Sequence, residues 1–344
     1  MSPHTVPRFE IADAVRMARE IYGLGAEARL LPSERDQNFA LQTAAGEKFV
    51  LKIAKSDEAR RDLELQNAAL KHVARHAPSL ALQRLVATSQ GEDIATIMGA
   101  QGQSYFLRLM TWLEGEMFVH ARPHDAVLLE SLGCAMAEMD LAFQDFSHPA
   151  MDRELHWDVK RADLALQYLP LLPDSQQAIV RRFMNAWEKI EWQGLRHSVI
   201  HGDANDYNVL VRQGRVAGLL DFGDMVHSAT ACDLAIALSY AMLDKPDPLA
   251  AASPVIRAYH ARYPLTGAEA GALFSLTAAR LCMSICYAAH NAQAKTGDAY
   301  QLVTAAPAWE LLQRLDAQPL HFLQNSFRNA CAPYSVSNEW MMDA

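Results

Sequence analysis

Hydrophobic and polar positions divide the chain into a strand-rich first third and a helix-rich remainder. An amphipathic helix is predicted over residues 9–22, where apolar side chains recur on one stripe. A second helix is predicted over 57–76, where charged and apolar residues alternate at helical spacing. Short apolar segments separated by polar turns indicate strands around these helices. The predicted strands lie at 28–31, 39–43, 48–54, 81–87, 93–98 and 104–110.

After residue 111 the apolar spacing becomes mainly helical. Helices are predicted at 124–144, 158–169, 174–191, 229–243, 267–292 and 298–315. Three short strand candidates interrupt them at 198–200, 209–211 and 216–220. The tail from Ala317 is polar, and no regular element is predicted there.

This order of elements predicts an α+β fold with two lobes. The β-rich N-lobe spans residues 1–110 and combines the N-terminal helix, an antiparallel sheet and the second helix. The mainly helical C-lobe spans 111–344, and the two join near 109–115. Ligand sites favour the cleft between such lobes.

Composition and charge narrow the class of protein. Of 344 residues, 51% are hydrophobic and 21% charged, which is typical of a soluble globular chain. The net charge of −9 disfavours a nucleic-acid partner. No uninterrupted apolar stretch is long enough to span a bilayer, and the first twenty residues lack the apolar segment of a signal peptide. The five cysteines are scattered, so we expect reduced thiols and a cytoplasmic location; the oligomeric state stays open.

The segment His201–Asn208 carries the strongest chemical signal. It reads His-Gly-Asp-Ala-Asn-Asp-Tyr-Asn and lies between two predicted strands. Thirteen residues after Asn208, Asp221 begins an Asp-Phe-Gly motif, residues 221–223, at the end of the next strand. This is the spacing of a kinase catalytic loop and its metal motif. Asp, Asn and Gly are also common in turns, but the two motifs together favour the kinase interpretation.

The chemistry of phosphoryl transfer explains these residue types. A carboxylate must accept the proton of the incoming hydroxyl and orient its oxygen, and Asp203 suits that role. Mg²⁺ must bridge phosphate oxygens, and it prefers hard oxygen ligands. The amide of Asn208 and the carboxylate of Asp221 supply such ligands.

Lys52 stands within the apolar strand 48–54, where a buried ammonium needs an anion. In a kinase that anion is the nucleotide's phosphate, and a helix glutamate holds the lysine. Glu64 is the expected partner, with Glu58 as the alternative. A lysine that extends along a surface strand would also fit the pattern.

The segment Leu31–Phe39 joins the first two strands, where a kinase folds a loop over the phosphates. It contains no glycine and therefore does not match G-x-G-x-x-G. Ser33, Gln37 and Asn38 are the candidates for phosphate contacts, and a polar hairpin turn remains the alternative.

Two further groups of residues could bind a metal by spacing alone. Cys282, Cys286 and His290 stand at i, i+4 and i+8, but a buried helix stripe is the more frequent reason for that spacing. His72 and His76 stand at i and i+4 without the glutamate of an H-E-x-x-H motif.

These motifs resemble the aminoglycoside phosphotransferase / choline kinase superfamily. His201–Asn208 and 221–223, preceded by Lys52, match its pattern, and Gly202 stands where protein kinases carry arginine. The resemblance covers roughly residues 25–315. It implies a protein-kinase-like bilobal fold, ATP or GTP as phosphoryl donor, and Mg²⁺.

A finer resemblance is to the hydroxylysine kinase branch, through Leu31–Ser33, Asp36–Phe39 and Glu64–Asn67. It implies phosphorylation of the side-chain hydroxyl of an amino acid, 5-hydroxylysine in the animal enzyme, with GTP as donor. The expected function is therefore a small-molecule kinase that acts on a hydroxyl of an amino acid or amino alcohol. The roles it implies are nucleotide phosphates for Lys52, the partner of that lysine for Glu64, the base for Asp203, and Mg²⁺ for Asn208 and Asp221.

Two more carboxylates, Asp206 and Asp224, lie close to the catalytic elements and would attract an ammonium group of the substrate. A solvated turn residue is the alternative for Asp206. Homoserine kinase, choline/ethanolamine kinase and aminoglycoside kinase remain alternative functions of the same class. A pseudokinase-like nucleotide-binding module is the alternative of another class, although Lys52, Asp203 and Asp221 are all present.

Overall fold

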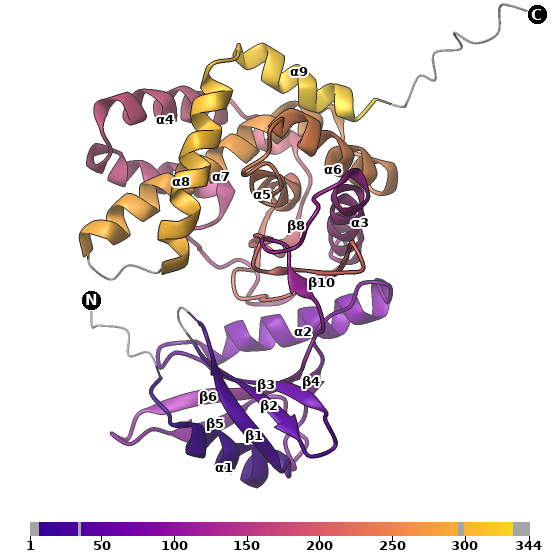
Figure 1. Cartoon of the computed structure of the whole chain (residues 1–344), viewed down its shortest axis with the longest axis vertical. Helices are drawn as coiled ribbons and strands as arrows, with labels where there is room; N and C mark the ends of the chain where they lie inside the picture. Colours follow the sequence, from indigo (N-terminus) through magenta and orange to yellow (C-terminus); the bar gives the residue numbers. More distant parts are fainter. Residues whose placement is uncertain (1–6, 34–35, 295–298, 333–344) are drawn as a thin grey trace, which may run out of the picture. The chain divides into compact units, whose positions relative to one another are not determined.

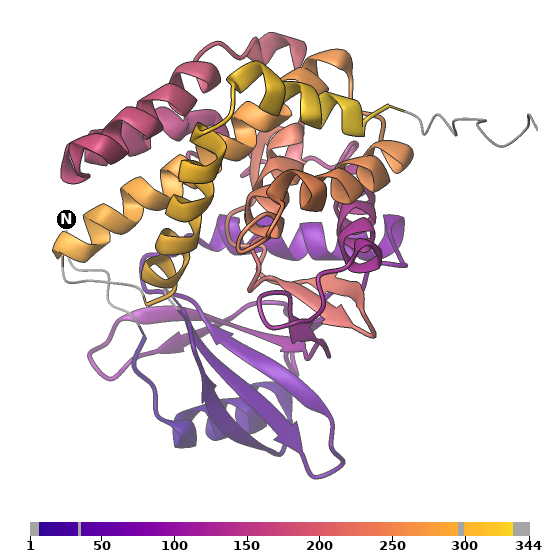
Figure 2. The same cartoon turned by 45° about the horizontal axis from the view of Figure 1, so that its top comes forward.

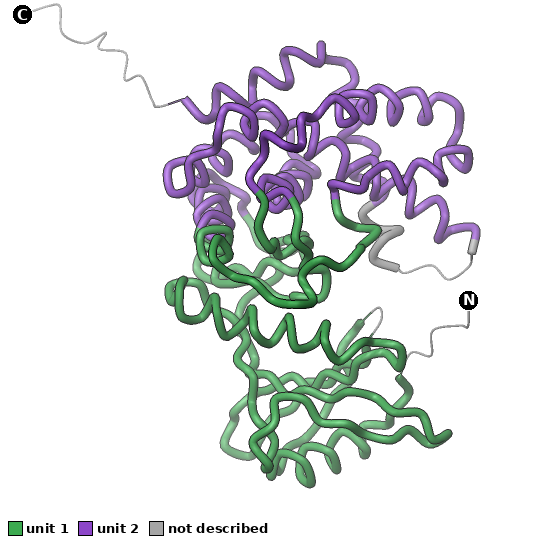
Figure 3. The backbone as a smooth tube through the Cα atoms, turned by 180° about the vertical axis from the view of Figure 1, so that it is seen from behind, with its two compact units in different colours: residues 1–122, 138–158, 197–228 green, residues 123–137, 159–196, 229–344 purple. Residues whose placement is uncertain are grey.

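The computed structural model describes residues 7–33, 36–294 and 299–332, and these belong to two compact units (Figure 3). Unit 1 comprises residues 1–122, 138–158 and 197–228, and unit 2 comprises 123–137, 159–196 and 229–344. This division differs from the predicted boundary near residue 110, because the segment with the catalytic and metal motifs groups with the N-terminal sheet. Two pairings tie that segment to unit 1: a bridge between Ala81 and Gly218, and a strand at 116–117 that joins the later hairpin.

Unit 1 is built on an antiparallel sheet that confirms the predicted meander. Its strands run in the order β1-β2-β3-β6-β4, and β5 pairs with β6. Their bounds are β1 Ala26–Leu31, β2 Gln37–Thr43, β3 Lys48–Ile53, β4 Leu85–Val86, β5 Ala95–Met98 and β6 Ser104–Thr111. The strand predicted over 81–87 shrinks to the two residues of β4.

One helix covers each face of this sheet (Figures 1 and 2). Helix α1 (Ile11–Tyr22) begins at a capping box between Glu10 and Asp13 and ends at Gly23, whose left-handed φ of 68° suits glycine. It packs on the odd-numbered side chains of β2 and β3, among them Phe39 and Leu51. Because side chains alternate along a strand, the even-numbered ones point to the other face, which α2 (Arg60–His76) covers.

A second antiparallel group in unit 1 carries the catalytic segment. Strand β9 (Val209–Arg212) pairs with β10 (Arg215–Leu219) and β7 (Glu116–Met117), and β8 (His197–Ile200) pairs with β11 (Val226–Ala229). The hairpin turn at Gln213 and Gly214 has φ of 53° and 69°, as a two-residue type I′ turn requires. The predicted strands at 198–200, 209–211 and 216–220 are confirmed, whereas β7 and β11 were not predicted.

Unit 2 is helical, and all residues of its helix α5 (Ala231–Ala241) are buried. Its other regular elements are the 3-10 helices η1 Val159–Leu171 and η2 Trp192–Gly194 and the helices α4 Asp174–Trp187, α6 Pro248–Arg262, α7 Gly267–Ala294, α8 Ala299–Asp316 and α9 Leu320–Ala330. Helix α3 (Ala126–Ala142) contributes residues to both units. Helices α6 and α9 were not predicted.

Among the described helices, α7 is the one long and apolar enough to cross a membrane. Its most apolar stretch of 18 residues is 89% buried inside the protein, as expected for a core helix. The predicted α+β class is confirmed by the antiparallel sheet of unit 1 and the helices of unit 2.

Candidate active site

Gly202 sets the conformation of the candidate catalytic loop. Its φ is +79°, in the left-handed region that only glycine enters without strain. A Cβ atom there would lie 2.2 Å from the carbonyl oxygen of Asp224. The loop is therefore pressed against the segment that follows Asp221, and any larger residue at position 202 would separate the two motifs.

His201 joins the same two segments from inside the protein. Its ring is fully buried, and Nε2 lies 2.9 Å from the carbonyl oxygen of Leu220. Because Nδ1 accepts the backbone N–H of Asp203 at 3.3 Å, Nε2 carries the proton and donates to Leu220. The ring also meets Phe222 edge to face at 4.9 Å between centroids. The backbone N–H of Leu220 donates to the carbonyl of Asn208 at 2.8 Å, so both ends of the loop are fixed.

Two amides orient the carboxylate of Asp203. The Nδ2 atoms of Asn205 and Asn208 each donate to Asp203 Oδ2 at 2.9 Å. Asn208 Nδ2 also reaches the backbone oxygen of Asp203 at 3.0 Å, which turns its amide oxygen the other way. Charged acceptors make the stronger hydrogen bonds, so these contacts hold the carboxylate in one orientation.

Asn205 is a supporting residue that the sequence analysis did not single out. Its Oδ1 accepts the backbone N–H groups of Tyr207 at 2.8 Å and Asn208 at 3.0 Å, while its Nδ2 reaches Asp203. Asparagine side chains often accept a hydrogen bond from the backbone N–H two residues later, and this preference could have identified Asn205 from the sequence.

Asp221 stands at the end of β10 with a left-handed φ of 56°. Its Oδ1 accepts the N–H of Gly223 at 3.0 Å and lies 3.9 Å from Nζ of Lys52. The positive charge of Lys52 lowers the pKa of Asp221, and the hydrogen bond from Gly223 acts in the same direction. The lowered pKa favours the ionised carboxylate, and its half-exposed side chain is accessible to a metal ion.

The α2-facing side of the sheet has an apolar row next to a polar row. Ala40, Val50 and Met110 pair across β2, β3 and β6 and are buried. Two residues further along the same strands, Asn38, Lys52 and Arg108 form the next row on that face. Adjacent rows on one face are about 7 Å apart, so a base on the apolar row would place its phosphates at the polar row.

Asn38 and Lys52 both belong to this polar row and stay candidates for phosphate contacts. The Oδ1 of Asn38 is buried without a partner among the described groups. Gln37 does not belong to this row. It faces the α1 side of the sheet, where its amide oxygen accepts the N–H of Phe9 and its amide nitrogen donates to the Phe9 carbonyl, both at 2.8 Å. The alternation of side chains along β2 turns it away from Lys52. Ser33 is exposed, and residues 34 and 35 of the same loop lie outside the described residues.

Glu64 is not the partner of Lys52 in this structure. It pairs with Arg60 at 3.0 Å and is half exposed, whereas Lys52 pairs with Asp221. The rotational phase of α2 explains this, because the helix turns Gln66 and Asn67 toward the sheet and leaves Glu64 on its outer side. The alternative partner, Glu58, pairs with Lys55 at 3.5 Å.

The two carboxylates predicted to attract a substrate ammonium lie in the same segment. Asp206 is 8% exposed, so it is not a solvated turn residue, and its backbone carbonyl accepts the N–H of Val119 at 2.9 Å. Asp224 is partly buried and lies against Gly202 through its backbone. Burial strengthens the field of a carboxylate, which favours a cationic group nearby.

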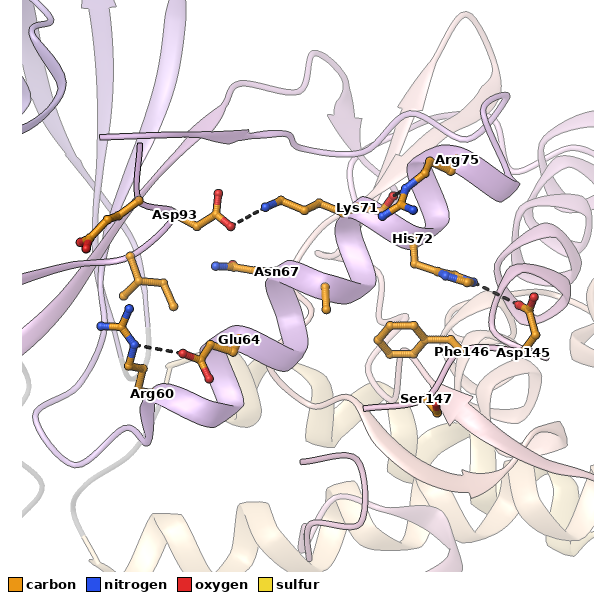
Figure 4. A pocket seen from close by; sticks show the side chains of 13 residues that line it. Arg60, Glu64, Asn67, Lys71, His72, Arg75, Asp93, Asp145, Phe146 and Ser147 are labelled. Carbon is orange, nitrogen blue, oxygen red and sulfur yellow. Dashed lines mark hydrogen bonds and ion pairs between the residues drawn. The ribbon is translucent and has the colours of Figure 1, made fainter. Parts of the chain in front are cut away.

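A separate pocket of about 610 Å³ lies along the outer side of α2 (Figure 4). Its walls carry the ion pairs Arg60–Glu64 and Lys71–Asp93 and a contact of 3.2 Å between His72 Nε2 and Asp145. His72, His76 and Asp145 have ligand atoms close enough to share a metal ion. His72 Nε2 also contacts the carbonyl of Ala142 at 2.7 Å, so that nitrogen is already engaged as a donor. Of the predicted site residues, the pocket includes Glu64 but not Lys52, Asp203 or Asp221.

Comparison with known proteins gives a family match and relatives of known activity. The sequence profile of the phosphotransferase enzyme family matches residues 27–273. Hydroxylysine kinase of Mus musculus is 27% identical over 338 residues, which cover 90% of each chain. Homoserine kinase of Nitrobacter winogradskyi is 28% identical over 272 residues, covering 77% of this chain and 78% of that enzyme.

Two solved structures share the fold. A microcompartment-associated aminopropanol kinase superposes with a TM-score of 0.69 at 19% identity, covering 90% of this chain and 98% of its own. Amicoumacin kinase, solved with AMP-PNP and Ca²⁺, has a TM-score of 0.69 at 16% identity, covering 90% of this chain and 95% of its own. The predicted kinase-like fold is confirmed.

Proposed function

We propose that the acceptor of this chain, which belongs to the phosphotransferase enzyme family, is a hydroxylated amine, with 5-hydroxylysine as the first candidate. The chain is a small-molecule kinase that phosphorylates a hydroxyl group. The observation that carries this proposal is the match to hydroxylysine kinases over 90% of the chain. The buried carboxylate of Asp206 within the catalytic loop supports a cationic acceptor.

We propose ATP or GTP as the phosphoryl donor, bound along the α2-facing side of β2, β3 and β6. The apolar row with Val50 would take the base, and Lys52 would contact the phosphates. The oxygen atoms of Asp221 and Asn208 fit Mg²⁺, because the carboxylate is ionised and the amide oxygen of Asn208 points away from Asp203. The bound metal would neutralise charge that develops on the phosphate oxygens.

Asp203 is proposed to position the acceptor hydroxyl and take its proton. Asn205 and Asn208 hold one carboxylate oxygen, which fixes the orientation of the group toward an incoming hydroxyl. Gly202 and His201 hold Asp203 and Asp221 in one fixed relation. Such positioning of acceptor and phosphoryl group supplies much of the rate of this reaction class.

Homoserine kinase is the second candidate, because the match to the Nitrobacter winogradskyi enzyme covers 77% of the chain. Both acceptors are amino acids with a side-chain hydroxyl, so the same carboxylates could bind either.

A cytoplasmic location is also proposed, since all five cysteines are free thiols.

Initial rates with ATP and with GTP across five acceptors test the proposal: hydroxylysine, homoserine, choline, ethanolamine and an aminoglycoside. We expect the highest kcat/KM with hydroxylysine. A wide advantage for homoserine would establish the second candidate, and one for choline or an aminoglycoside would overturn both. Nucleotide binding without turnover of any acceptor would overturn the hydroxylated-amine proposal and favour a binding module.

The proposed ammonium site has its own test in Asp206→Asn. We expect a higher KM for the cationic acceptor and an unchanged rate of nucleotide hydrolysis without acceptor, because water needs no ammonium site. Asp174→Asn, an exposed position at the start of α4, is the matched control. An unchanged KM in the Asp206 variant would remove that residue from the substrate site.

A further inference from the structure

Arg108 is a buried cation whose hydrogen-bond partners are neutral. It lies in β6 and is 3% exposed. Its Nη1 donates to Oδ1 of Asn67 at 2.9 Å and its Nη2 to Oε1 of Gln66 at 2.8 Å, both from α2. A buried charge is costly unless it is paired, so a guanidinium held by amides is unusual. The amides satisfy its donors but do not cancel its charge.

The neighbour of Arg108 across the strands is a second cation. Lys52 of β3 is directly opposite Arg108 of β6, and both side chains point to the α2 side of the sheet. The Cβ atoms of such a pair are about 4.5–5.5 Å apart, and like charges in this position destabilise a sheet unless an anion lies near them.

The carboxylates around Arg108 do not form an ion pair with it. Burial lowers the pKa of Arg108, and the charges of Asp36, Asp221 and Glu58 oppose that shift from a distance. In the part of the chain that the structure describes, no ion pair within 4.0 Å includes Arg108. Asp221 lies 3.9 Å from Lys52 and is the carboxylate that pairs with that lysine among the described residues.

We propose that Arg108 is a second fixed cation of the nucleotide-phosphate site. Gln66 and Asn67 hold it in place beside Lys52 and leave its charge to attract the polyphosphate. A glutamate or aspartate at either helix position would accept the same hydrogen bonds and cancel that charge. This inference rests on the proposed nucleotide site on the same sheet face, and it assigns a role to a residue outside the kinase motifs.

The test is a single added charge that keeps the link between α2 and the sheet. Arg108→Met would remove the charge and the link together, so Gln66→Glu is the sharper variant, with Asn67→Asp as an independent repeat. Dissociation constants are measured by calorimetry with divalent metal chelated. The probes are the triphosphate, diphosphate, monophosphate and nucleoside of adenine and of guanine, so that the charge of the ligand falls stepwise.

We expect Gln66→Glu to weaken binding of the triphosphate at least about tenfold, the diphosphate and monophosphate progressively less, and the nucleoside not at all. Thermal stability should be kept, because the new carboxylate pairs with Arg108. Gln90→Glu makes the same chemical change in an exposed turn of unit 1 and should leave all the constants unchanged.

If binding of every probe is weakened equally, or binding of none is weakened, the inference is overturned and Arg108 is a structural link between helix and sheet. Failure of the unmodified protein to bind either triphosphate, both with metal chelated and with Mg²⁺ added, is a distinct result, since it would overturn the proposed function and this inference together.

Discussion

The catalytic segment and the junction between α2 and the sheet are held together in different ways. In the catalytic segment, backbone groups bond to backbone groups and to one buried ring, and Gly202 leaves no room for a Cβ atom. At the α2 junction, long side chains from distant segments meet as a guanidinium on two amides. The first region should tolerate no added atom, whereas the second should tolerate changes of charge at constant shape.

The largest expected effect is on chemistry in the catalytic segment. Asp203→Asn keeps the shape of the side chain but cannot accept the proton of the acceptor hydroxyl. We expect turnover to fall by ~10²–10⁴-fold, the usual contribution of a general base, with nucleotide affinity nearly unchanged. Steady-state kinetics and calorimetric titration measure the two quantities. Unaltered turnover would remove Asp203 from the mechanism.

The next effect separates metal binding from the role of Asp203. Asp221→Ala should reduce the metal-dependent gain in nucleotide affinity at least about tenfold, because that carboxylate is the proposed ligand. Titration of nucleotide with and without Mg²⁺ into Asp221→Ala and Asp203→Asn provides the comparison. Equal affinities of the two variants in the presence of Mg²⁺ would mean that Asp221 does not bind the metal.

Gly202→Ala tests the tightness of the catalytic segment directly. The Cβ atom combines a left-handed φ with a backbone contact of 2.2 Å, so we expect a loss of ~2–4 kcal/mol in the free energy of unfolding together with lower turnover. Gly46→Ala is the matched control, because its φ is +86° but its Cβ would meet nothing within 4 Å. That change should cost about 1–2 kcal/mol and leave turnover intact. Similar losses in both variants, read from denaturant unfolding, would show that the close approach at Gly202 is unimportant.

The smallest effect is expected on the outer side of α2. Glu64→Ala removes an exposed pair with Arg60, which is worth at most ~1 kcal/mol. We expect turnover and melting temperature close to those of the unmodified protein. If turnover falls as much as in Lys52→Met, measured in the same assay, Glu64 contacts Lys52 during catalysis. The α2 junction would then depend on an exact contact, as the catalytic segment does.

The fold was predicted correctly where the spacing of apolar residues and the positions of polar turns indicated the same elements. The meander of β1 to β3, helix α2 and the long α7 follow from apolar spacing between polar turns. Helix α6 was missed because Pro248 and Pro254 lie within it, although the first stands at a helix start, where proline is tolerated. Helix α9 was missed because it buries just Leu323 and Phe327, and such a narrow stripe is weak without its tertiary contacts.

The sequence by itself determined the parts of the site that depend on neighbours along the chain. Asp203 and Asn208 meet within one loop, and His201 and Asp221 flank the same hairpin, so spacing and turn chemistry suffice to predict them. Tertiary structure alone decided which residue of α2 turns to the sheet. One helical step is 100°, so the difference between Glu64 and Gln66 depends on how the buried stripe packs. That packing placed Arg108 on two neutral amides beside Lys52 and left Glu64 with Arg60.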